Sequence, residues 1–433
     1  MARVLLAGVS TRAAAESAAR AGFAVTAVDA FADLDQHASV RALALPRRFT
    51  AHAAARAARD VECDAVAYGS SFENHPRAVA ALAAGRTLWG NTPAVLRRVR
   101  DPYLVAQTLG RRGFPVPIVR SGEPVEPVAL PEQVEPLDPS ARDWLVKPLA
   151  SGGGRRVRPW RRTDRTGGRR ADRSRAARVP RGCYLQELVE GTPGSVVFVA
   201  AGGRAVPLGV SRQLIGETAF GATGYRYCGS ILAPAGDAGR GDDIDDLDDL
   251  DDMALVDRAC ALARAVAEEF GLAGVNGIDF IARNGIPYAI EVNPRWCASM
   301  ELVERAYGVS VFGAHAAACA AGALPDFDLA RARRGASAVG KAVIFARRDV
   351  VVGDTHAWLA HLAVPAHPAL PAHPAREIPE IHDVPRAGEE IAAGRPVCTV
   401  FAAGHDAASC HATLVRHAER VYADLAGWER RVA

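Results

Sequence analysis

Two neighbouring apolar segments contain two carboxylates and an amide that could bind a metal ion. Asp279 lies in GVNGIDFIA (274–282), and Glu291 and Asn293 lie in PYAIEVN (287–293). Side chains alternate between the two faces of a strand, so Glu291 and Asn293 project to one side, and Asp279 can face that side across the ladder. Oxygen ligands of this kind favour Mg²⁺ (or Mn²⁺) held together with substrate phosphates. The spacing therefore predicts a divalent metal site; the alternative is an ordinary charged surface hairpin.

The two segments are joined by a sequence typical of a tight turn. Arg283-Asn284-Gly285 is a hairpin signal, which favours an antiparallel pair over two unrelated strands. Pro294 ends the second strand, and Arg295 follows it. The hairpin is thus expected to place a guanidinium beside the metal cluster.

A lysine followed by a run of glycines is the second pattern. Only two of the 52 basic residues are lysine, and one of them, Lys147, precedes the run Ser151, Gly152, Gly153 and Gly154. Consecutive glycines let backbone N–H groups approach phosphate oxygens, and the ammonium adds a point charge. No GK[ST] follows, so this is not a Walker loop, and an ordinary glycine-rich turn is the alternative.

Three further groups of polar residues are candidates for binding. CYLQELVEGTPGS (183–195) is expected to present main-chain groups to an adenine and a carboxylate to a ribose; the alternative is a strand leading into an acidic turn. Glu73 and Asn74 follow a predicted strand, at the sheet edge where α/β proteins bind ligands. Arg212 could clamp a substrate carboxylate in a bidentate manner. Ordinary loop polarity is the alternative for the last two groups.

The elements that position these residues begin with a parallel α/β layer. Predicted strands at 3–9, 23–30 and 63–71 alternate with helices at 11–21 and 51–60. The first turn lacks G-x-G-x-x-G, so a nicotinamide cofactor is not expected. Further along, Thr92-Pro93 begins a predicted helix, and two more are expected at 253–270 and 298–322.

Composition excludes several classes of function. At 433 residues the chain suits two or three domains, with 49% apolar and 23% charged residues. No apolar run is long enough to span a bilayer, and no signal peptide is evident, so a cytoplasmic protein without membrane contact is expected. Eight cysteines without a CxxC pair predict free thiols.

Biased segments interrupt the chain. The Arg-rich 155–181 has Trp160 as its one aromatic residue, so nucleic-acid binding is not expected, and 242–252 is nearly all acidic. Both are interpreted as solvated insertions. Pro-rich stretches at 121–139 and 365–379 are interpreted as linkers or loops.

Taken in order, three segments resemble the ATP-grasp superfamily: WLVKPLASGGGRRV (144–157), YLQELVEG (184–191) and GVNGIDF…AIEVNPRW (274–296). The resemblance implies a nucleotide bound between two α+β subdomains under a glycine-rich hairpin, with two magnesium ions. It implies that Lys147 contacts the α- and β-phosphates, and that Gly152–Gly154 cover them. The residues implied for the nucleotide base and ribose are Gln186, Glu187, Val189 and Glu190. Those implied for the metal and the transferred phosphoryl group are Asp279, Glu291, Asn293 and Arg295.

The resemblance also implies a domain order of mixed α/β and α+β class. A Rossmann-like α/β domain (1–95) would precede the ATP-grasp domain (96–330) and a small β-rich C-terminal domain (331–433). The tail, 382–404, is similar to the C-terminal domain of biotin-carboxylase-like members. The chain is further similar to predicted carboligases from organisms that use methanopterin-type one-carbon carriers, which implies cofactor biosynthesis.

Two positions depart from the pattern of the superfamily. Asp101-Pro102 stands where many members have Asp-Lys, so the first phosphate lysine is missing, and Arg98 or Arg100 would replace it only in part. Gly194 stands where an acidic residue is usual. Neither position belongs to the predicted metal site.

The expected reaction activates a carboxylate as an acyl phosphate with ATP and couples it to an amine. Both substrates would be small molecules, and the chain is compatible with a homodimer. A bicarbonate-dependent carboxylase acting through carboxyphosphate and a non-catalytic ATP-binding regulator are the alternatives. The biotin-carboxylase-like tail favours the first alternative, and the missing lysine favours the second.

Overall fold

The computed structural model describes residues 1–45, 49–121, 143–160, 179–234, 252–363 and 380–432. The core of the Arg-rich segment, nearly all of the acidic segment and most of both Pro-rich stretches lie outside these ranges. Within the described residues, no helix combines the length and the apolar character needed to cross a bilayer. All eight cysteines are free thiols, as predicted.

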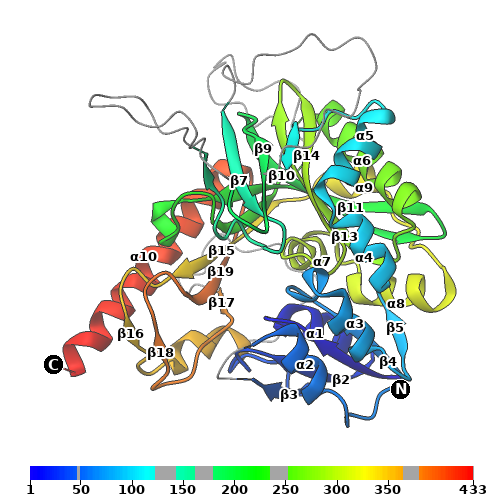
Figure 1. Ribbon diagram of the computed structural model, residues 1–433. Coiled ribbons are helices and arrows are strands. Elements are labelled where there is room, and N and C mark those ends of the chain that lie inside the picture. Colours follow the sequence, from blue (N-terminus) through cyan, green and yellow to red (C-terminus); the bar gives the residue numbers. More distant parts are fainter. Residues whose placement is uncertain (46–48, 122–142, 161–178, 235–251, 364–379, 433) are drawn as a thin grey trace, which may run out of the picture.

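The N-terminal part is a parallel five-stranded sheet with the order β3-β2-β1-β4-β5 (Figure 1). Its strands are β1 (Arg3–Ala7), β2 (Ala24–Asp29), β3 (Arg41–Ala44), β4 (Ala65–Tyr68) and β5 (Thr87–Trp89). Apolar side chains of α1 (Arg12–Arg20) pack on one face, and those of α2 (Ala51–Ala57) and α3 (Pro76–Leu82) pack on the other. The α/β prediction is confirmed, but β3 was not predicted because its exposed residues follow no apolar pattern.

The central part is an antiparallel eight-stranded sheet with the order β14-β13-β10-β11-β12-β15-β19-β17. These strands are β10 (Thr192–Ala201), β11 (Arg204–Ile215), β12 (Tyr227–Leu232), β13 (Gly274–Arg283), β14 (Ile286–Asn293), β15 (Ala338–Phe345), β17 (Glu380–His382) and β19 (Pro396–Gly404). The last three come from the C-terminal hundred residues, so the large sheet combines strands from both sides of residue 331, which itself lies in a helix. A short pair, β16 (Val350–Val351) and β18 (Glu390–Ile391), lies beside it.

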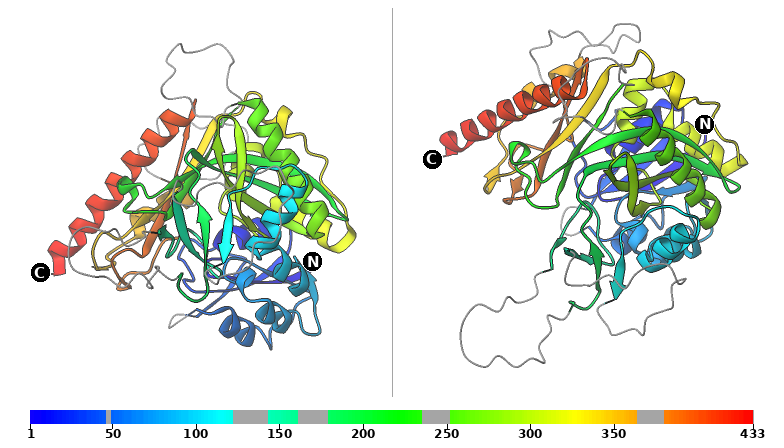
Figure 2. Two further views of the ribbon diagram at one scale, coloured as in Figure 1. Left: turned by 45° about the horizontal axis from the view of Figure 1, so that its top comes forward. Right: turned by 90° about the horizontal axis from the view of Figure 1, so that it is seen from above.

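Helices cover both faces of the large sheet. One apolar cluster joins it to α4 (Pro93–Val99), α5 (Pro102–Arg111), α6 (Met253–Phe270) and α9 (Leu329–Arg333). A second joins it to α7 (Met300–Tyr307) and α8 (Val311–Ala321), and a third to α10 (Ala407–Val432). Figure 2 shows α10 (red) beside the C-terminal strands, at the far end of the sheet from α4 and α5 (cyan).

A small four-stranded sheet, with the order β6-β9-β7-β8, completes the fold. Its strands are β6 (Val119–Ser121), β7 (Trp144–Pro148), β8 (Arg158–Pro159) and β9 (Cys183–Glu187). Within the described ranges, 3₁₀ segments lie in three connections: η1 (Phe72–Asn74), η3 (Thr218–Phe220) and η5 (His356–Ala363).

Local sequence explains several element boundaries. Thr92 accepts a hydrogen bond from the Val95 N–H at 3.3 Å and caps α4, as predicted. Asn284 and Gly285 both have positive φ, 54° and 68°, which the tight turn between β13 and β14 requires. The single helix predicted over 298–322 is wrong: Gly308, with φ of 68°, ends α7, and the Ser310 side chain caps α8.

Candidate active site

A cleft of about 1090 Å³ lies where the three sheets meet. The carboxyl edge of the N-terminal sheet, the small sheet and one face of the large sheet all contribute to its lining. A pocket for one drug-sized ligand measures about 300–1,000 Å³, so this cleft has room for more than one small molecule. Every site residue predicted from the sequence lines it except Arg212.

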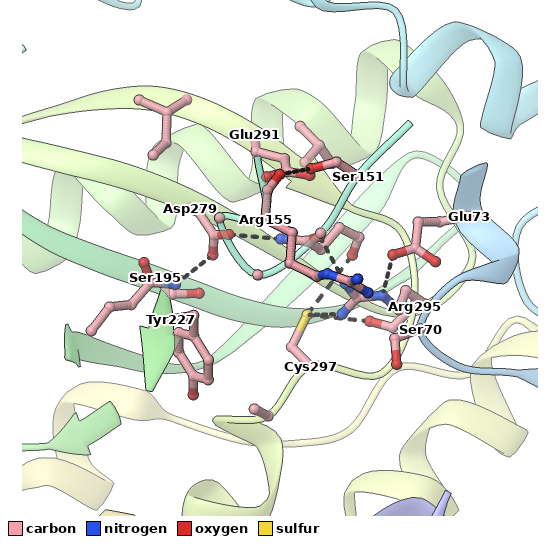
Figure 3. Close-up of a pocket in the computed structure, with 18 of the residues that line it drawn as sticks. Ser70, Glu73, Ser151, Arg155, Ser195, Tyr227, Asp279, Glu291, Arg295 and Cys297 are labelled. Atoms are coloured by element: carbon pink, nitrogen blue, oxygen red, sulfur yellow. Dashed lines mark hydrogen bonds and ion pairs between the residues drawn. The ribbon is translucent and has the colours of Figure 1, made fainter. Parts of the chain in front are cut away.

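The predicted metal ligands share one face of the β13–β14 hairpin, and Figure 3 shows two of them, Asp279 and Glu291. Asp279 lies opposite Glu291 in the ladder, and the Asn293 Nδ2 donates to Asp279 Oδ2 at 2.9 Å. Gln213 donates to the other carboxylate oxygen of Asp279 at 2.8 Å. Val292 points to the opposite face, where it is buried in the apolar core. The alternation expected of the strand therefore holds at these positions.

The two carboxylates, Asp279 and Glu291, repel each other electrostatically. Burial, and then the charge of Glu291, raise the pKa of Asp279 to about 6. Burial also disfavours ionised Glu291, but Arg100 and Lys147 outweigh it and hold the Glu291 pKa below its ordinary value. A cation beside both carboxylates would lower the free-energy cost of ionising Asp279.

The donor set fits a hard divalent cation. Among the described residues, no three His, Cys, Asp or Glu side chains gather around one point. A metal held by Asp279, Glu291 and Asn293 would therefore take its remaining ligands from substrate oxygens and water, as Mg²⁺ commonly does.

Lys147 on β7 is buried and faces the hairpin. Its Nζ donates to Gln186 Oε1 at 2.9 Å and to the Ile290 carbonyl at 3.3 Å, and both acceptors are neutral. The Ile290 carbonyl is turned toward it where the β13–β14 register shifts. Burial lowers the pKa of Lys147, although Glu291 and Asp279 act against this. A buried ammonium held by neutral oxygens suits an incoming anion.

The glycine-rich segment lies across the cleft as a flap. Gly153 accepts a hydrogen bond from the Tyr227 N–H at 3.2 Å, and the Ser151 carbonyl accepts one from Asn74 Nδ2 at 3.2 Å. A Cβ on Gly154, where φ is 71°, would lie 1.6 Å from the Tyr225 carbonyl oxygen. Only glycine fits this approach of two backbones.

Arg295 ties the hairpin to the N-terminal sheet. Its Nε donates to Glu73 Oε1 at 2.9 Å (Figure 3), and its Nη2 donates to Asn293 Oδ1 at 3.1 Å. Burial lowers the pKa of Arg295, but Glu73 outweighs this and keeps it raised. Glu73 thus meets a protein cation with one oxygen, while its buried Oε2 has no partner among the described atoms.

Arg100 is the residue whose importance the sequence did not settle. Its Nη1 donates to Glu291 Oε1 at 2.6 Å, and its Nη2 donates to the Ser151 carbonyl at 3.1 Å. Arg98 instead donates to the Glu269 carbonyl and stacks on a phenylalanine, and it does not line the cleft. The sequence feature that could have singled out Arg100 is Asp101. Its side chain caps α5 and so fixes the preceding residue, Arg100, at the cleft wall.

The residues predicted to bind the nucleotide base and ribose lie at the end of β9 and directly after it, along the cleft. Gln186 and Val189 are buried, and Glu190 is exposed at the rim. Glu187 accepts from the Ile118 N–H at 3.1 Å, which fixes its carboxylate against β6. The four residues therefore form one wall at the end of the small sheet.

The structure does not bring Arg212 to this site. Neighbouring residues of a strand face opposite sides, and on β11 it is Gln213 that faces the cleft. Cys297 lies beside Arg295 as a buried thiol, and burial raises its pKa to about 12. It is thus a poor nucleophile.

Residues 99–238 and 250–299 match the model of the ATP-grasp domain. No protein of curated function matches the chain by sequence. The matched segments contain the flap, the β9 wall and the β13–β14 hairpin.

Solved structures share the fold of nearly the whole chain. The L-amino acid ligase from Bacillus licheniformis is 13% identical with a TM-score of 0.60, over 97% of both chains. N5-carboxyaminoimidazole ribonucleotide synthetase from Thermotoga maritima is 15% identical with a TM-score of 0.57, over 97% of this chain and 98% of its own. The biotin carboxylase domain of the Hydrogenobacter thermophilus 2-oxoglutarate carboxylase, solved with MgADP and bicarbonate, is 15% identical with a TM-score of 0.60, over 92% and 85%. At these identities the likeness establishes the fold.

Proposed function

We propose that this chain, an ATP-grasp protein by its domain and fold, uses ATP to activate a carboxylate as an acyl phosphate and couples it to an amine. ADP and phosphate would be released. One observation carries the proposal: Lys147, Asp279, Glu291 and Arg295 converge in a single cleft beneath a glycine flap. Lys147 and the glycine flap belong to the small sheet, whereas the other three residues lie on the β13–β14 hairpin or directly after it. No single element therefore explains why the two groups meet.

The phosphates would be held between the small sheet and the hairpin. Lys147 supplies a buried charge, and Gly152–Gly154 bring backbone close to the same space. Glu187 and Val189 would border the adenine, and Glu190 at the rim would meet the ribose. Arg100 supplies the second cation of the phosphate end, in place of the lysine that this chain lacks.

The metal ligands would be Asp279, Glu291 and Asn293. Bound Mg²⁺ would offset phosphate charge as the carboxylate attacks. Arg295 stands beside this set and would stabilise charge on the transferred phosphoryl group. Its ion pair with Glu73 holds the guanidinium in place, so little reorganisation is required during the reaction.

The flap would protect the intermediate from water. An acyl phosphate that met water would hydrolyse before the amine attacked, and ATP would be wasted. The contact between Gly153 and Tyr227 and the contacts of Ser151 with Asn74 and Arg100 hold the flap over the cleft. These contacts link all three sheets, so closure depends on the whole assembly.

A carboxylase is the second candidate function. The shared fold covers 85% of a biotin carboxylase domain that was solved with MgADP and bicarbonate. Bicarbonate would then take the place of the organic carboxylate and form carboxyphosphate. ADP release that requires bicarbonate and no added amine would favour this reaction over amide formation.

The test is a phosphate-release screen with Mg²⁺, ATP and pools of carboxylates and amines. Glu291→Gln keeps the shape of the side chain, so the fold should persist while turnover falls by about 10²–10³-fold. Glu268→Gln, at an exposed position of α6, is the matched control and should retain full activity. Full activity of Glu291→Gln would refute the metal assignment. Tight ATP binding without turnover in both the wild type and Glu291→Gln would instead support a regulator.

A further inference from the structure

The end of the cleft beyond Tyr227 carries a row of alternating charges. Asp383 Oδ1 accepts from Arg12 Nε at 2.8 Å, Arg12 Nη2 donates to Glu301 Oε1 at 2.8 Å, and Lys341 Nζ donates to Glu301 Oε2 at 2.8 Å. We call these four residues the distal charge row. It joins the N-terminal sheet, α7 and the C-terminal strands, and the reaction proposed above uses none of it.

The two ends of the row retain hydrogen-bonding capacity toward the cleft. Lys341 lines the cleft, and its ammonium has three donors but a single acceptor among the described atoms, Glu301. Asp383 also lines the cleft, and 27% of its side chain is exposed. Among the described atoms, its carboxylate accepts hydrogen bonds only from Arg12 and Thr399. The middle is saturated, because each nitrogen of the Arg12 guanidinium already donates to a carboxylate.

The free donor and the free acceptor lie close together. On β15 and β19, Lys341 is opposite Phe401 and Val343 is opposite Thr399, so Lys341 and Thr399 are diagonal neighbours. Diagonal neighbours lie about 7–8 Å apart, and Asp383 accepts a hydrogen bond from the Thr399 hydroxyl at 2.5 Å. An ammonium and a carboxylate of the protein therefore face one small space.

Asp383 is held in an unusual backbone conformation. Its φ is 55°, which is uncommon for a residue other than glycine. Its N–H donates to Asp35 Oδ2 at 3.1 Å, and the Val384 N–H donates to Asp35 Oδ1 at 2.9 Å. Conformations of this kind persist where the surroundings fix them, and they cluster at binding sites.

The row lies far from the metal hairpin. Four strand steps separate β13 from β15 across the sheet, and at about 4.8 Å per step this is roughly 19 Å. A group held by Lys341 and Asp383 is therefore not the group that meets the phosphate. Such a group would belong to the remote end of a substrate and would fix the position of the rest.

We propose that Lys341 and Asp383 bind the carboxylate and the ammonium of a zwitterionic substrate of the amino-acid type. Lys341 donates to the substrate carboxylate, and Asp383 accepts from the substrate ammonium. Arg12 and Glu301 position the pair and neutralise each other behind it. The inference rests on the proposed function for the reaction, and it adds the class of one substrate.

Calorimetric binding tests the inference without requiring turnover. The probes are the standard amino acids, each compared with its amide, which lacks the carboxylate, and its N-acetyl derivative, which lacks the ammonium. The wild type should bind at least one amino acid about tenfold or more tightly than either derivative, because each derivative loses one charge-assisted hydrogen bond. Absence of binding by every amino acid overturns the inference.

Two variants assign the groups. Lys341→Met should abolish the preference for acid over amide, and Asp383→Asn should abolish the preference for amine over N-acetyl. Glu16→Gln is the control, because Glu16 also pairs with Arg12 but does not line the cleft. A purely structural row would lower the thermal midpoint of the variants and leave both preferences intact, which overturns the inference. ATP turnover is measured separately: turnover with uncharged-end substrates and no zwitterion binding would refute this site while leaving the ligase proposal standing.

Discussion

Asp279→Asn should stabilise the ligand-free protein while abolishing ATP turnover. Burial and the neighbouring Glu291 raise the pKa of Asp279 to about 6 in the folded chain, against an ordinary value of 3.8. An acid whose pKa is raised by folding lowers stability wherever it is ionised. The cost is absent below about pH 4, grows as the pH rises toward 6, and is complete above that.

The size of the effect follows from the shift. About two pKa units correspond to about 3 kcal/mol, an upper limit because Asp279 is partly exposed to the cleft. Asparagine at position 279 recovers only part of this free energy of unfolding. Its NH₂ group would face an NH₂ donor of Asn293 or Gln213, and the lost hydrogen bond costs roughly 1 kcal/mol. A net gain of about 1–2 kcal/mol at pH 8 remains.

Urea denaturation of the ligand-free protein at pH 8 and at pH 4 measures this gain. The variant should show the higher midpoint at pH 8 and a smaller advantage at pH 4, where Asp279 is mostly protonated in the wild type. MgATP at 100 times its Kd should stabilise the wild type by about 2.7 kcal/mol and the variant far less. Asp257→Asn, at an exposed position of α6, is the control and should change neither. Equal or lower stability of Asp279→Asn at pH 8 would refute the electrostatic account of the hairpin.

Three further predictions concern the phosphate end. Gly154→Ala should keep the fold but lose at least about tenfold in coupled turnover, because the added methyl group prevents flap closure, whereas Gly152→Ala has space and should stay active; the ratio of product formed to ATP consumed measures this. Lys147→Arg should weaken ATP binding, measured by calorimetry, because a planar guanidinium does not fit a site built for an ammonium. Mg²⁺ without nucleotide should raise the thermal midpoint of Arg100→Met more than that of the wild type, because Arg100 already occupies Glu291. An equal shift in both proteins would contradict the competition.

Sequence reasoning succeeded where the chemistry lies within one local element. The β13–β14 hairpin followed from strand alternation and from Asn284-Gly285, and its three polar side chains share a face as expected. The glycine flap was likewise a contiguous run. At both places the period of the secondary structure and the turn residues contain the needed information.

Sequence reasoning ended where the site depends on packing between distant segments. Arg100 and Glu291 are 191 residues apart, and Glu73 and Arg295 are 222 apart, so no periodicity relates them. Arg212 was assigned by chemical type, yet which face a strand residue takes is set by register, and that face belongs to Gln213. The C-terminal strands likewise join the large sheet by pairing with strands that are distant in sequence, which no local sequence pattern predicts.

The contacts of Arg100 bear on how the two ligands enter. The Arg100 guanidinium donates to Glu291 Oε1 at 2.6 Å and to the flap at the Ser151 carbonyl at 3.1 Å. A cation arriving alone at Glu291 would meet this charge and leave Arg100 without its anionic partner, which is costly for a buried group. A triphosphate that arrives with the cation gives Arg100 a replacement partner and gives Lys147 an anion beside its two neutral acceptors. Metal and nucleotide should therefore bind as one unit, and the flap that Arg100 holds should respond to that unit rather than to either ligand alone.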